Sequence, residues 1–186
     1  MKFNKRSIPN YISVFRLLLI PLFVYFYFSK RDIAKAVSTF LVAGASDVLD
    51  GYLARRNNWT SNLGRVLDPL ADKCMQITVL VSLSLDKIVP WWISGILIGK
   101  EILLMLGATR LIKKFHVYAQ SGWYGKGAVV FFYAVVVVLM LFKGISNTVR
   151  VILSSSLIVA MTFALIMYYV KIYRAKAVRK KELAAK

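Results

Sequence analysis

Four aspartates in one short window are the residues of this sequence best suited to chemistry. The chain has only 8 acidic residues among 186, and Asp47, Asp50, Asp68 and Asp72 all fall within residues 47–72. The first pair is spaced i, i+3 and the second i, i+4, so each pair shares one face of a helix. Gathered carboxylates repel one another unless a cation lies between them, and all-oxygen ligation suits Mg²⁺, Mn²⁺ or Ca²⁺. The window therefore predicts a divalent-metal site.

Small and basic residues accompany these carboxylates. Gly51 follows the first pair and Gly64 precedes the second, and a glycine lets a ligand approach the backbone closely. Arg55 lies one turn beyond Gly51 and can offer a fork of donors to a phosphate. The window contains no histidine, so a carboxylate must act as general base if a hydroxyl group attacks phosphorus there. Two divalent ions held by the two pairs would clamp both oxygens of such a displacement.

Strongly apolar segments surround this window. The chain is 59% hydrophobic with a mean hydropathy of +0.62, which is more apolar than an ordinary soluble domain. A membrane span needs about 20 apolar residues, and six segments fit. They are expected as helices at residues 8–28, 33–56, 63–85, 91–112, 126–142 and 149–173. We therefore expect an all-α, polytopic membrane protein with six transmembrane helices and a single domain over residues 1–186.

These helices determine where the carboxylates lie in the membrane. The first acidic pair is in the last third of segment 33–56, and the second is in the first third of segment 63–85. Successive spans run antiparallel, so the two pairs should lie at the same end, just inside one membrane face. Four carboxylates facing lipid would be very costly, so they should face the protein interior.

Basic residues predict the orientation. The formal net charge is +18, and six spans place both termini on one side with the loop after Arg55, the loop near Lys113 and the basic tail at 171–186. The other side holds fewer cations: Lys30, Arg31, Lys35, Lys87, Lys143 and Arg150. The positive-inside rule then places the termini and the carboxylates on the cytoplasmic side of the plasma membrane. The tail is expected to bind anionic lipid. No nucleic-acid partner is expected, because such charge should form a patch on a soluble face.

Other polar residues interrupt the apolar segments. Arg16 lies two turns inside the first segment, where it either snorkels to the interface or, with Asn10, faces the polar site and contacts a substrate phosphate. Lys100 and Glu101 are sequence neighbours that do not share a helix face, so we expect each to need a separate partner.

The acidic window also resembles a known signature. From Asp47 to Asp72 it reads D-x2-D-G-x2-A-R-x8-G-x3-D-x3-D without a gap or mismatch. This pattern resembles the signature of the CDP-alcohol phosphatidyltransferases, which are integral membrane enzymes of phospholipid synthesis. Eight fixed positions at fixed spacing make the resemblance specific, although the window is a small part of the chain.

The resemblance implies roles for the residues of the window. Asp47, Asp50 and Asp68 would bind two Mg²⁺ or Mn²⁺ ions, and Asp72 would also face the metals and take the proton of the acceptor. CDP-diacylglycerol and an alcohol would give a phosphatidyl-alcohol and CMP by direct attack, without a phosphatidyl-enzyme. The family also suggests a homodimer. The residues that would line the cytidine diphosphate pocket are Asn10, Asp47, Gly51, Ala54, Arg55 and Gly64.

Cations outside the window bear on the acceptor. Lys100, Arg110 and Lys126, together with Arg16, would suit an acceptor that itself carries phosphate, which favours glycerol 3-phosphate. The amino-terminal residues Ile8-Pro9-Asn10, followed by Arg16 and Ile20-Pro21, also resemble the start of the branch of the family that makes phosphatidylglycerophosphate. That branch typically has Arg-Glu where this chain has Lys100-Glu101, so inositol phosphate, serine and phosphatidylglycerol remain alternative acceptors.

A non-enzymatic function is the competing class. Paired carboxylates inside a membrane also mark cation-coupled transporters. A transporter has no reason to keep Gly51, Ala54, Arg55 and Gly64 at these spacings. Stabilisation by CMP with Mg²⁺ or Mn²⁺ separates the two classes, because a transporter should ignore the nucleotide.

Overall fold

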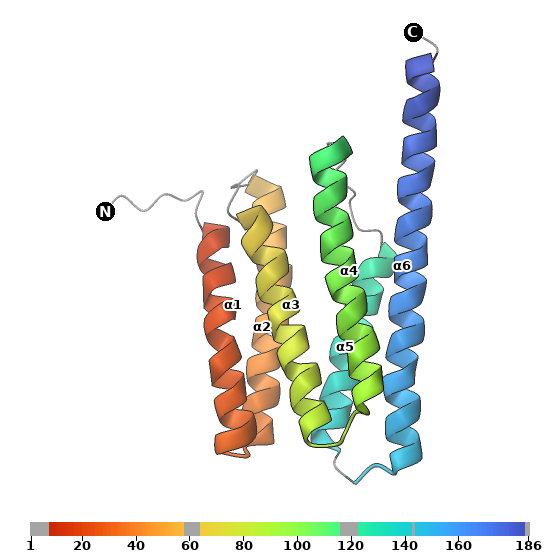
Figure 1. The fold of residues 1–186 in the computed structure, drawn as a ribbon. Helices are drawn as coiled ribbons and strands as arrows, with labels where there is room; N and C mark the ends of the chain where they lie inside the picture. Colours follow the sequence, from red (N-terminus) through yellow and green to blue (C-terminus); the bar gives the residue numbers. More distant parts are fainter. Residues whose placement is uncertain (1–7, 58–63, 116–122, 143, 185–186) are drawn as a thin grey trace, which may run out of the picture. The chain divides into compact units, whose positions relative to one another are not determined.

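The computed structural model describes the backbone of residues 8–57, 64–115, 123–142 and 144–184. Side chains are described for residues 11–49, 70–103, 124–142, 144–167 and 169–170. Every regular element within these ranges is a helix, and they contain no strand (Figure 1). The all-α class expected from the sequence is confirmed for the described residues.

The helices begin and end close to the expected positions. They are α1 (Ile8–Val24), the π-helix η2 (Tyr25–Ser29) that continues it, α2 (Ile33–Asn57), α3 (Gly64–Leu85), α4 (Trp91–Phe115), α5 (Trp123–Leu141) and α6 (Asn147–Ala184). The last helix is longer than expected because it continues through the basic tail, which is rich in the good helix formers Ala, Lys and Arg.

Three helical stretches among the described residues are long and apolar enough to cross a membrane. They are Tyr11–Ser29, Tyr124–Leu141 and Asn147–Met167. Their outer surfaces agree with contact to lipid, because large apolar side chains such as Leu18, Val130 and Val159 are exposed. The chain is therefore a helical membrane protein with at least these three candidate spans.

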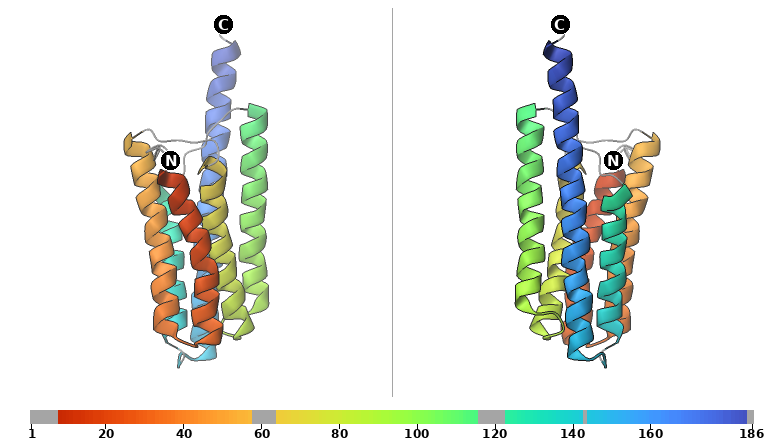
Figure 2. Two further views of the ribbon diagram at one scale, coloured as in Figure 1. Left: turned by 90° about the vertical axis from the view of Figure 1, so that its left-hand side faces the viewer. Right: turned by 90° about the vertical axis from the view of Figure 1, so that its right-hand side faces the viewer.

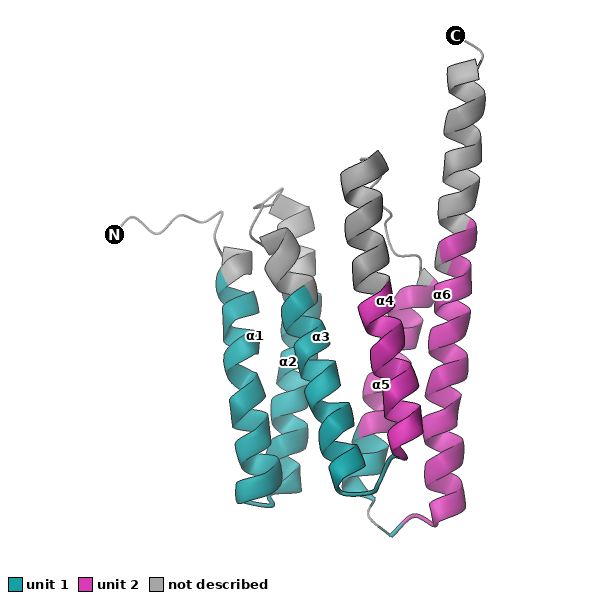
Figure 3. Cartoon of the chain, in the orientation of Figure 1, with its two compact units in different colours: residues 1–89, 137–144 teal, residues 90–136, 145–186 magenta. Residues whose placement is uncertain are grey.

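The chain divides into two compact units (Figure 3). Unit 1 contains residues 1–89 and 137–144, and unit 2 contains residues 90–136 and 145–186. Unit 1 thus holds α1, η2, α2 and α3, which carry the acidic window. Unit 2 holds the whole of α4 and α6, together with residues 123–136 of α5.

The core of unit 1 is a three-helix arrangement. α1 packs against both α2 and α3, and α2 also contacts α3 (Figure 2). Each helix buries one face, with residues three or four apart, as expected for packed helices. The buried residues include Leu19, Phe23 and Tyr27 of α1 with η2, Ala36, Phe40 and Ala43 of α2, and Met75, Val79 and Leu83 of α3. The small alanines let α2 approach its neighbours closely.

An ion pair joins the two turns at one end of unit 1. Arg31, in the turn before α2, donates from one guanidinium nitrogen to both carboxylate oxygens of Asp86, at 3.0 and 3.2 Å. The backbone of Arg31 is left-handed, with φ of 52°, which is uncommon for a residue other than glycine. Asp32 caps α2 by accepting from the Lys35 amide at 3.1 Å, and the Lys35 side chain lowers the pKa of the Asp32 carboxyl. Because Arg31 precedes α2 and Asp86 follows α3, their contact places the start of α2 beside the end of α3. The two helices therefore run antiparallel.

In unit 2, α4 packs on α6. Ile93 and Leu97 on α4, and Leu157 and Met161 on α6, are buried at helical spacing. In the same unit, the Tyr124 hydroxyl of α5 donates to the Met167 carbonyl of α6 at 3.4 Å.

Candidate active site

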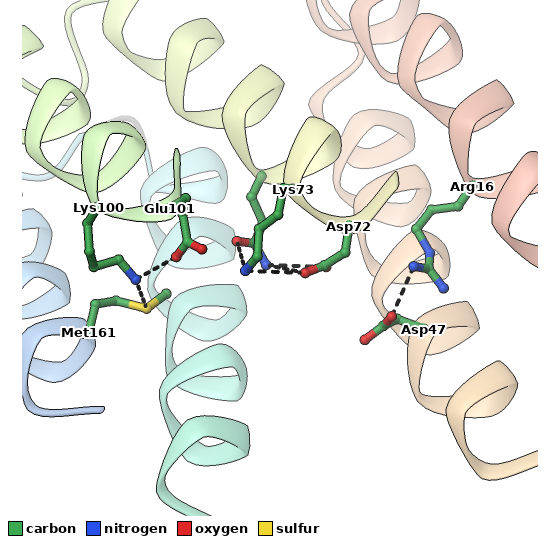
Figure 4. A network of polar contacts seen from close by, with 8 residues as sticks. Arg16, Asp47, Asp72, Lys73, Lys100, Glu101 and Met161 are labelled. Atoms are coloured by element: carbon green, nitrogen blue, oxygen red, sulfur yellow. Dashed lines mark hydrogen bonds and ion pairs between the residues drawn. The ribbon is translucent and has the colours of Figure 1, made fainter. Parts of the chain in front are cut away.

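A buried ion pair links the first helix to the acidic window. Arg16 Nη1 on α1 donates to Asp47 Oδ1 on α2 at 2.9 Å (Figure 4). The Arg16 side chain is 0% exposed, whereas 39% of the Asp47 side chain is exposed. Arg16 is buried because it continues the face of α1 that carries Leu19 and Phe23. The interpretation that Arg16 snorkels to the interface is therefore wrong, since its charge is matched inside the unit.

The second described carboxylate has a network of its own on α3. Gln76 Nε2 donates to both Asp72 oxygens at 3.2 Å. Lys73 Nζ donates to Gln76 Oε1 at 3.3 Å and lies 3.5 Å from Asp72 Oδ2. All three side chains come from adjacent turns of one helix, so their mutual placement depends on helical spacing alone.

Asp47 and Asp72 are brought together by the packing of unit 1. Both belong to helices that contact α1, and Figure 4 shows them as neighbours on α2 and α3. The charges of Asp47 and Arg16 both act on Asp72. This agrees with the expectation that the two acidic pairs lie at the same end of two antiparallel helices.

The other residues of the window are placed by backbone alone. Asp50, Gly51, Ala54 and Arg55 lie on the helical backbone of α2, and Gly64 and Asp68 lie on that of α3. Their side chains, like that of Asn10 on α1, lie outside the described residues. The continuous helices preserve the i, i+3 and i, i+4 relations within the two acidic pairs. The roles assigned to these residues stay predictions.

A second buried pair lies in unit 2. Lys100 Nζ donates to Glu101 Oε1 at 2.5 Å, and it also lies 3.4 Å from Met161 Sδ on α6 (Figure 4). The expectation that these neighbours need separate partners is wrong. The long lysine side chain bends back to the adjacent carboxylate, because a buried charge is costly unless an opposite charge matches it.

The remaining cations predicted for the acceptor lie elsewhere in unit 2. Lys126 is exposed on α5. Arg110 lies on the backbone of α4, and its side chain is outside the described residues. Convergence of these cations on one phosphate stays a prediction.

Comparison with known proteins decides the family. The model of the family described as CDP-alcohol phosphatidyltransferase matches residues 6–170. This chain belongs to the CDP-alcohol phosphatidyltransferase family. The match includes the whole acidic window, so the resemblance found from the window is confirmed by most of the sequence.

Relatives within the CDP-alcohol phosphatidyltransferase family carry two kinds of name. A Mycobacterium tuberculosis protein that carries the name "Putative cardiolipin synthase" is 41% identical to this chain over 98 residues. The alignment covers 53% of this chain and 47% of the relative. The Streptomyces coelicolor cardiolipin synthase (CMP-forming) is 35% identical over 127 residues, covering 66% and 59%. A Haemophilus influenzae CDP-diacylglycerol–glycerol-3-phosphate 3-phosphatidyltransferase is 39% identical over 109 residues, covering 56% and 57%. The chain thus spans about half the length of the curated relatives it matches.

The donor set of this family member fits a hard divalent cation. Asp47 and Asp72 offer carboxylate oxygens from neighbouring helices, and part of the Asp47 side chain is not covered by protein. Mg²⁺ and Mn²⁺ prefer oxygen ligands of this kind. No group of three or more His, Cys, Asp or Glu side chains gathers among those described. Asp50 and Asp68 fall outside that set, so the predicted four-carboxylate site is not tested by the described residues.

Proposed function

We propose that this chain transfers a phosphatidyl group from CDP-diacylglycerol to sn-glycerol 3-phosphate, giving phosphatidylglycerophosphate and CMP. The observation that carries the proposal is the intact acidic window in a family member, with Asp47 and Asp72 held in one helical unit. The name of the Haemophilus influenzae relative, which states this reaction, supports the choice of acceptor.

In the proposed reaction, the acceptor hydroxyl oxygen attacks the phosphorus that carries the diacylglycerol group. A P–O bond forms to the acceptor, and the P–O bond to CMP breaks, with CMP taking the electron pair. Asp72 takes the hydroxyl proton, and no phosphatidyl-enzyme forms. Two Mg²⁺ or Mn²⁺ ions, held by Asp47, Asp50, Asp68 and Asp72, would supply positive charge next to the attacking and leaving oxygens.

The other residues of the acidic window, together with Asn10 and Asp47, are proposed to bind the donor. Asn10, Asp47, Gly51, Ala54, Arg55 and Gly64 form the proposed cytidine diphosphate pocket. The glycines let the nucleotide approach the backbone, and the Arg55 guanidinium pairs with phosphate. Arg16, Lys100, Arg110 and Lys126 are the proposed contacts for the acceptor phosphate. Among them, Lys100 and Arg16 bring little net charge, because Glu101 and Asp47 already match them.

A second acceptor is favoured by a specific observation. Two of the relatives are named for cardiolipin synthesis, and their alignments are of similar extent to that of the Haemophilus influenzae protein. Phosphatidylglycerol is therefore the second candidate acceptor. Inositol phosphate and serine follow, and a cation-coupled transporter is the non-enzymatic alternative.

We also propose that all six α-helices cross the plasma membrane as one domain, with both termini and the acidic window on the cytoplasmic side. The uneven distribution of basic residues supports this orientation. The helical tail of α6 would bind anionic lipid on that side. The protein would act as a homodimer, as the family suggests.

The proposal is tested by CMP release from CDP-diacylglycerol with purified protein in detergent and Mg²⁺ or Mn²⁺. Glycerol 3-phosphate, phosphatidylglycerol, inositol phosphate, inositol and serine are supplied one at a time. Asp72→Asn removes the proposed base. Asp32→Asn is the matched control, because it makes the same chemical change outside the window and asparagine caps a helix as well as aspartate does.

We expect release with glycerol 3-phosphate that is retained by Asp32→Asn and lost by Asp72→Asn. Release with phosphatidylglycerol alone would assign the second acceptor. Absence of release with every acceptor, combined with no stabilisation by CMP and metal, would reject the enzyme in favour of the transporter.

A further inference from the structure

Gln76 is a buried amide in an otherwise apolar stretch of α3. Its residue is only 2% exposed, and Met75, Val79 and Leu80 around it on the helix are buried as well. A buried amide is costly unless its donors and acceptor are satisfied. At Gln76 both ends are satisfied, since Nε2 donates to Asp72 and Oε1 accepts from Lys73.

The neighbours of Gln76 fix the orientation of its amide. As the proposed base, Asp72 is ionised before it takes a proton, so its carboxylate can only accept hydrogen bonds, and the Lys73 ammonium can only donate them. Only one orientation of the amide satisfies both, with nitrogen towards Asp72 and oxygen towards Lys73. The two distances from Nε2 to the Asp72 oxygens are equal at 3.2 Å, so the amide engages the whole carboxylate.

We propose that Gln76 is a positioning residue that fixes the direction of the Asp72 carboxylate, with Lys73 locking the amide from the other side. This inference rests on the proposed function, in which Asp72 takes the acceptor proton. A carboxylate on a short side chain can otherwise rotate about its last bond. Catalytic groups have to be held within a small angular range, and neighbouring hydrogen bonds commonly do this.

A purely structural role for Gln76 makes a different prediction. Glutamine and aspartate one turn apart also stabilise a helix weakly. Loss of such a contact would lower stability without changing the rate of the chemical step. A positioning role would lower kcat while leaving substrate binding and folding almost unchanged.

Two variants of the full chain separate these roles. Gln76→Met keeps the length of the side chain and suits the apolar surroundings, but it removes the amide. Gln76→Asn keeps the amide and shortens its reach. Thr78→Val is the matched control, because Thr78 is a polar residue of the same helix. Among the described residues its hydroxyl bonds only to the Cys74 carbonyl one turn earlier. CMP release, KM for CDP-diacylglycerol and the midpoint of thermal unfolding are measured for each.

We expect kcat to fall about tenfold or more in both Gln76 variants, with KM changed by less than about twofold. The unfolding midpoint should stay close to that of the unsubstituted protein in Gln76→Met, and it should fall in Gln76→Asn, whose shortened amide is buried away from its partners. Thr78→Val should match the unsubstituted protein. Unchanged kcat in Gln76→Met and Gln76→Asn would overturn the inference and leave the proposed function standing. So would a fall in kcat in Gln76→Met that only accompanies a fall in its unfolding midpoint. An inactive unsubstituted protein would overturn both.

Discussion

The ion pair between Arg16 and Asp47 predicts an asymmetry in stability. Arg16 is 0% exposed, whereas the Asp47 side chain is 39% exposed. Asp47→Leu removes a carboxylate that pairs with a fully buried guanidinium. Arg16→Met leaves a carboxylate that the protein encloses only in part. The first change should therefore destabilise the protein more than the second, although both break the same contact.

The free energy lost when one member of an ion pair is removed depends on how deeply the remaining charge is buried. Removing one member of a buried ion pair costs about 3–5 kcal/mol, because the remaining charge stays buried. We expect a loss in this range for Asp47→Leu. For Arg16→Met the remaining carboxylate is only partly enclosed by protein, so the loss should be about 1–2 kcal/mol. The double variant Arg16→Met/Asp47→Leu carries no stranded charge and should lose less than Asp47→Leu alone.

The free energy of unfolding is measured for the purified protein in detergent. It is obtained by titrating the protein with denaturant and following the loss of its helical circular-dichroism signal. The four proteins form a double-mutant cycle, and Asp32→Asn serves as the control for loss of a carboxylate elsewhere in unit 1. An Arg16→Met variant that loses as much as Asp47→Leu would refute the reasoning. A double variant whose loss equals the sum of the two single losses would refute it as well.

Three further predictions follow from other features. Glu101→Gln should lower the unfolding midpoint clearly more than the double variant Lys100→Met/Glu101→Leu does. Only the single change leaves the buried Lys100 ammonium without the Glu101 carboxylate. Equal midpoints in the two variants would contradict an ion pair between Lys100 and Glu101. Gly95→Ala should leave the unfolding free energy unchanged or raise it by up to about 1 kcal/mol, since a Cβ there meets nothing within 4 Å among the described residues; a loss in stability would contradict the open space around Gly95. Chelation with EDTA should abolish CMP release, and Mg²⁺ or Mn²⁺ should restore it, whereas activity that survives chelation would exclude the proposed metal site.

Much of the helical architecture can be predicted from the sequence because local signals determine it. Pro90 and the polar residues before it end α3 and begin α4 where expected, and the apolar run that starts at Ile33 marks the beginning of α2. The end of α6 was harder to predict. Hydropathy marks only the part of a helix that is apolar, and the basic residues that follow are also good helix formers.

The partners of individual charges could not be predicted in the same way. Arg16 and Asp47 are 31 residues apart in the sequence, so their pairing depends on how α1 packs against α2. The pairing of Lys100 with Glu101 depends on the bending of a flexible side chain, which helical spacing does not specify. Gln76 gave a usable signal, since it is a polar residue one turn after Asp72 in an apolar stretch, but its importance depends on burial that only the structure shows.

The most direct test of the account is the transfer of radiolabelled glycerol 3-phosphate into extractable lipid. Purified protein is reconstituted with CDP-diacylglycerol and Mg²⁺ or Mn²⁺, and Asp72→Asn is measured beside it. The account predicts incorporation that requires CDP-diacylglycerol, yields phosphatidylglycerophosphate and CMP in equal amounts, and disappears in Asp72→Asn. Incorporation that Asp72→Asn retains, or a protein that folds and binds CMP but labels no lipid, would contradict it.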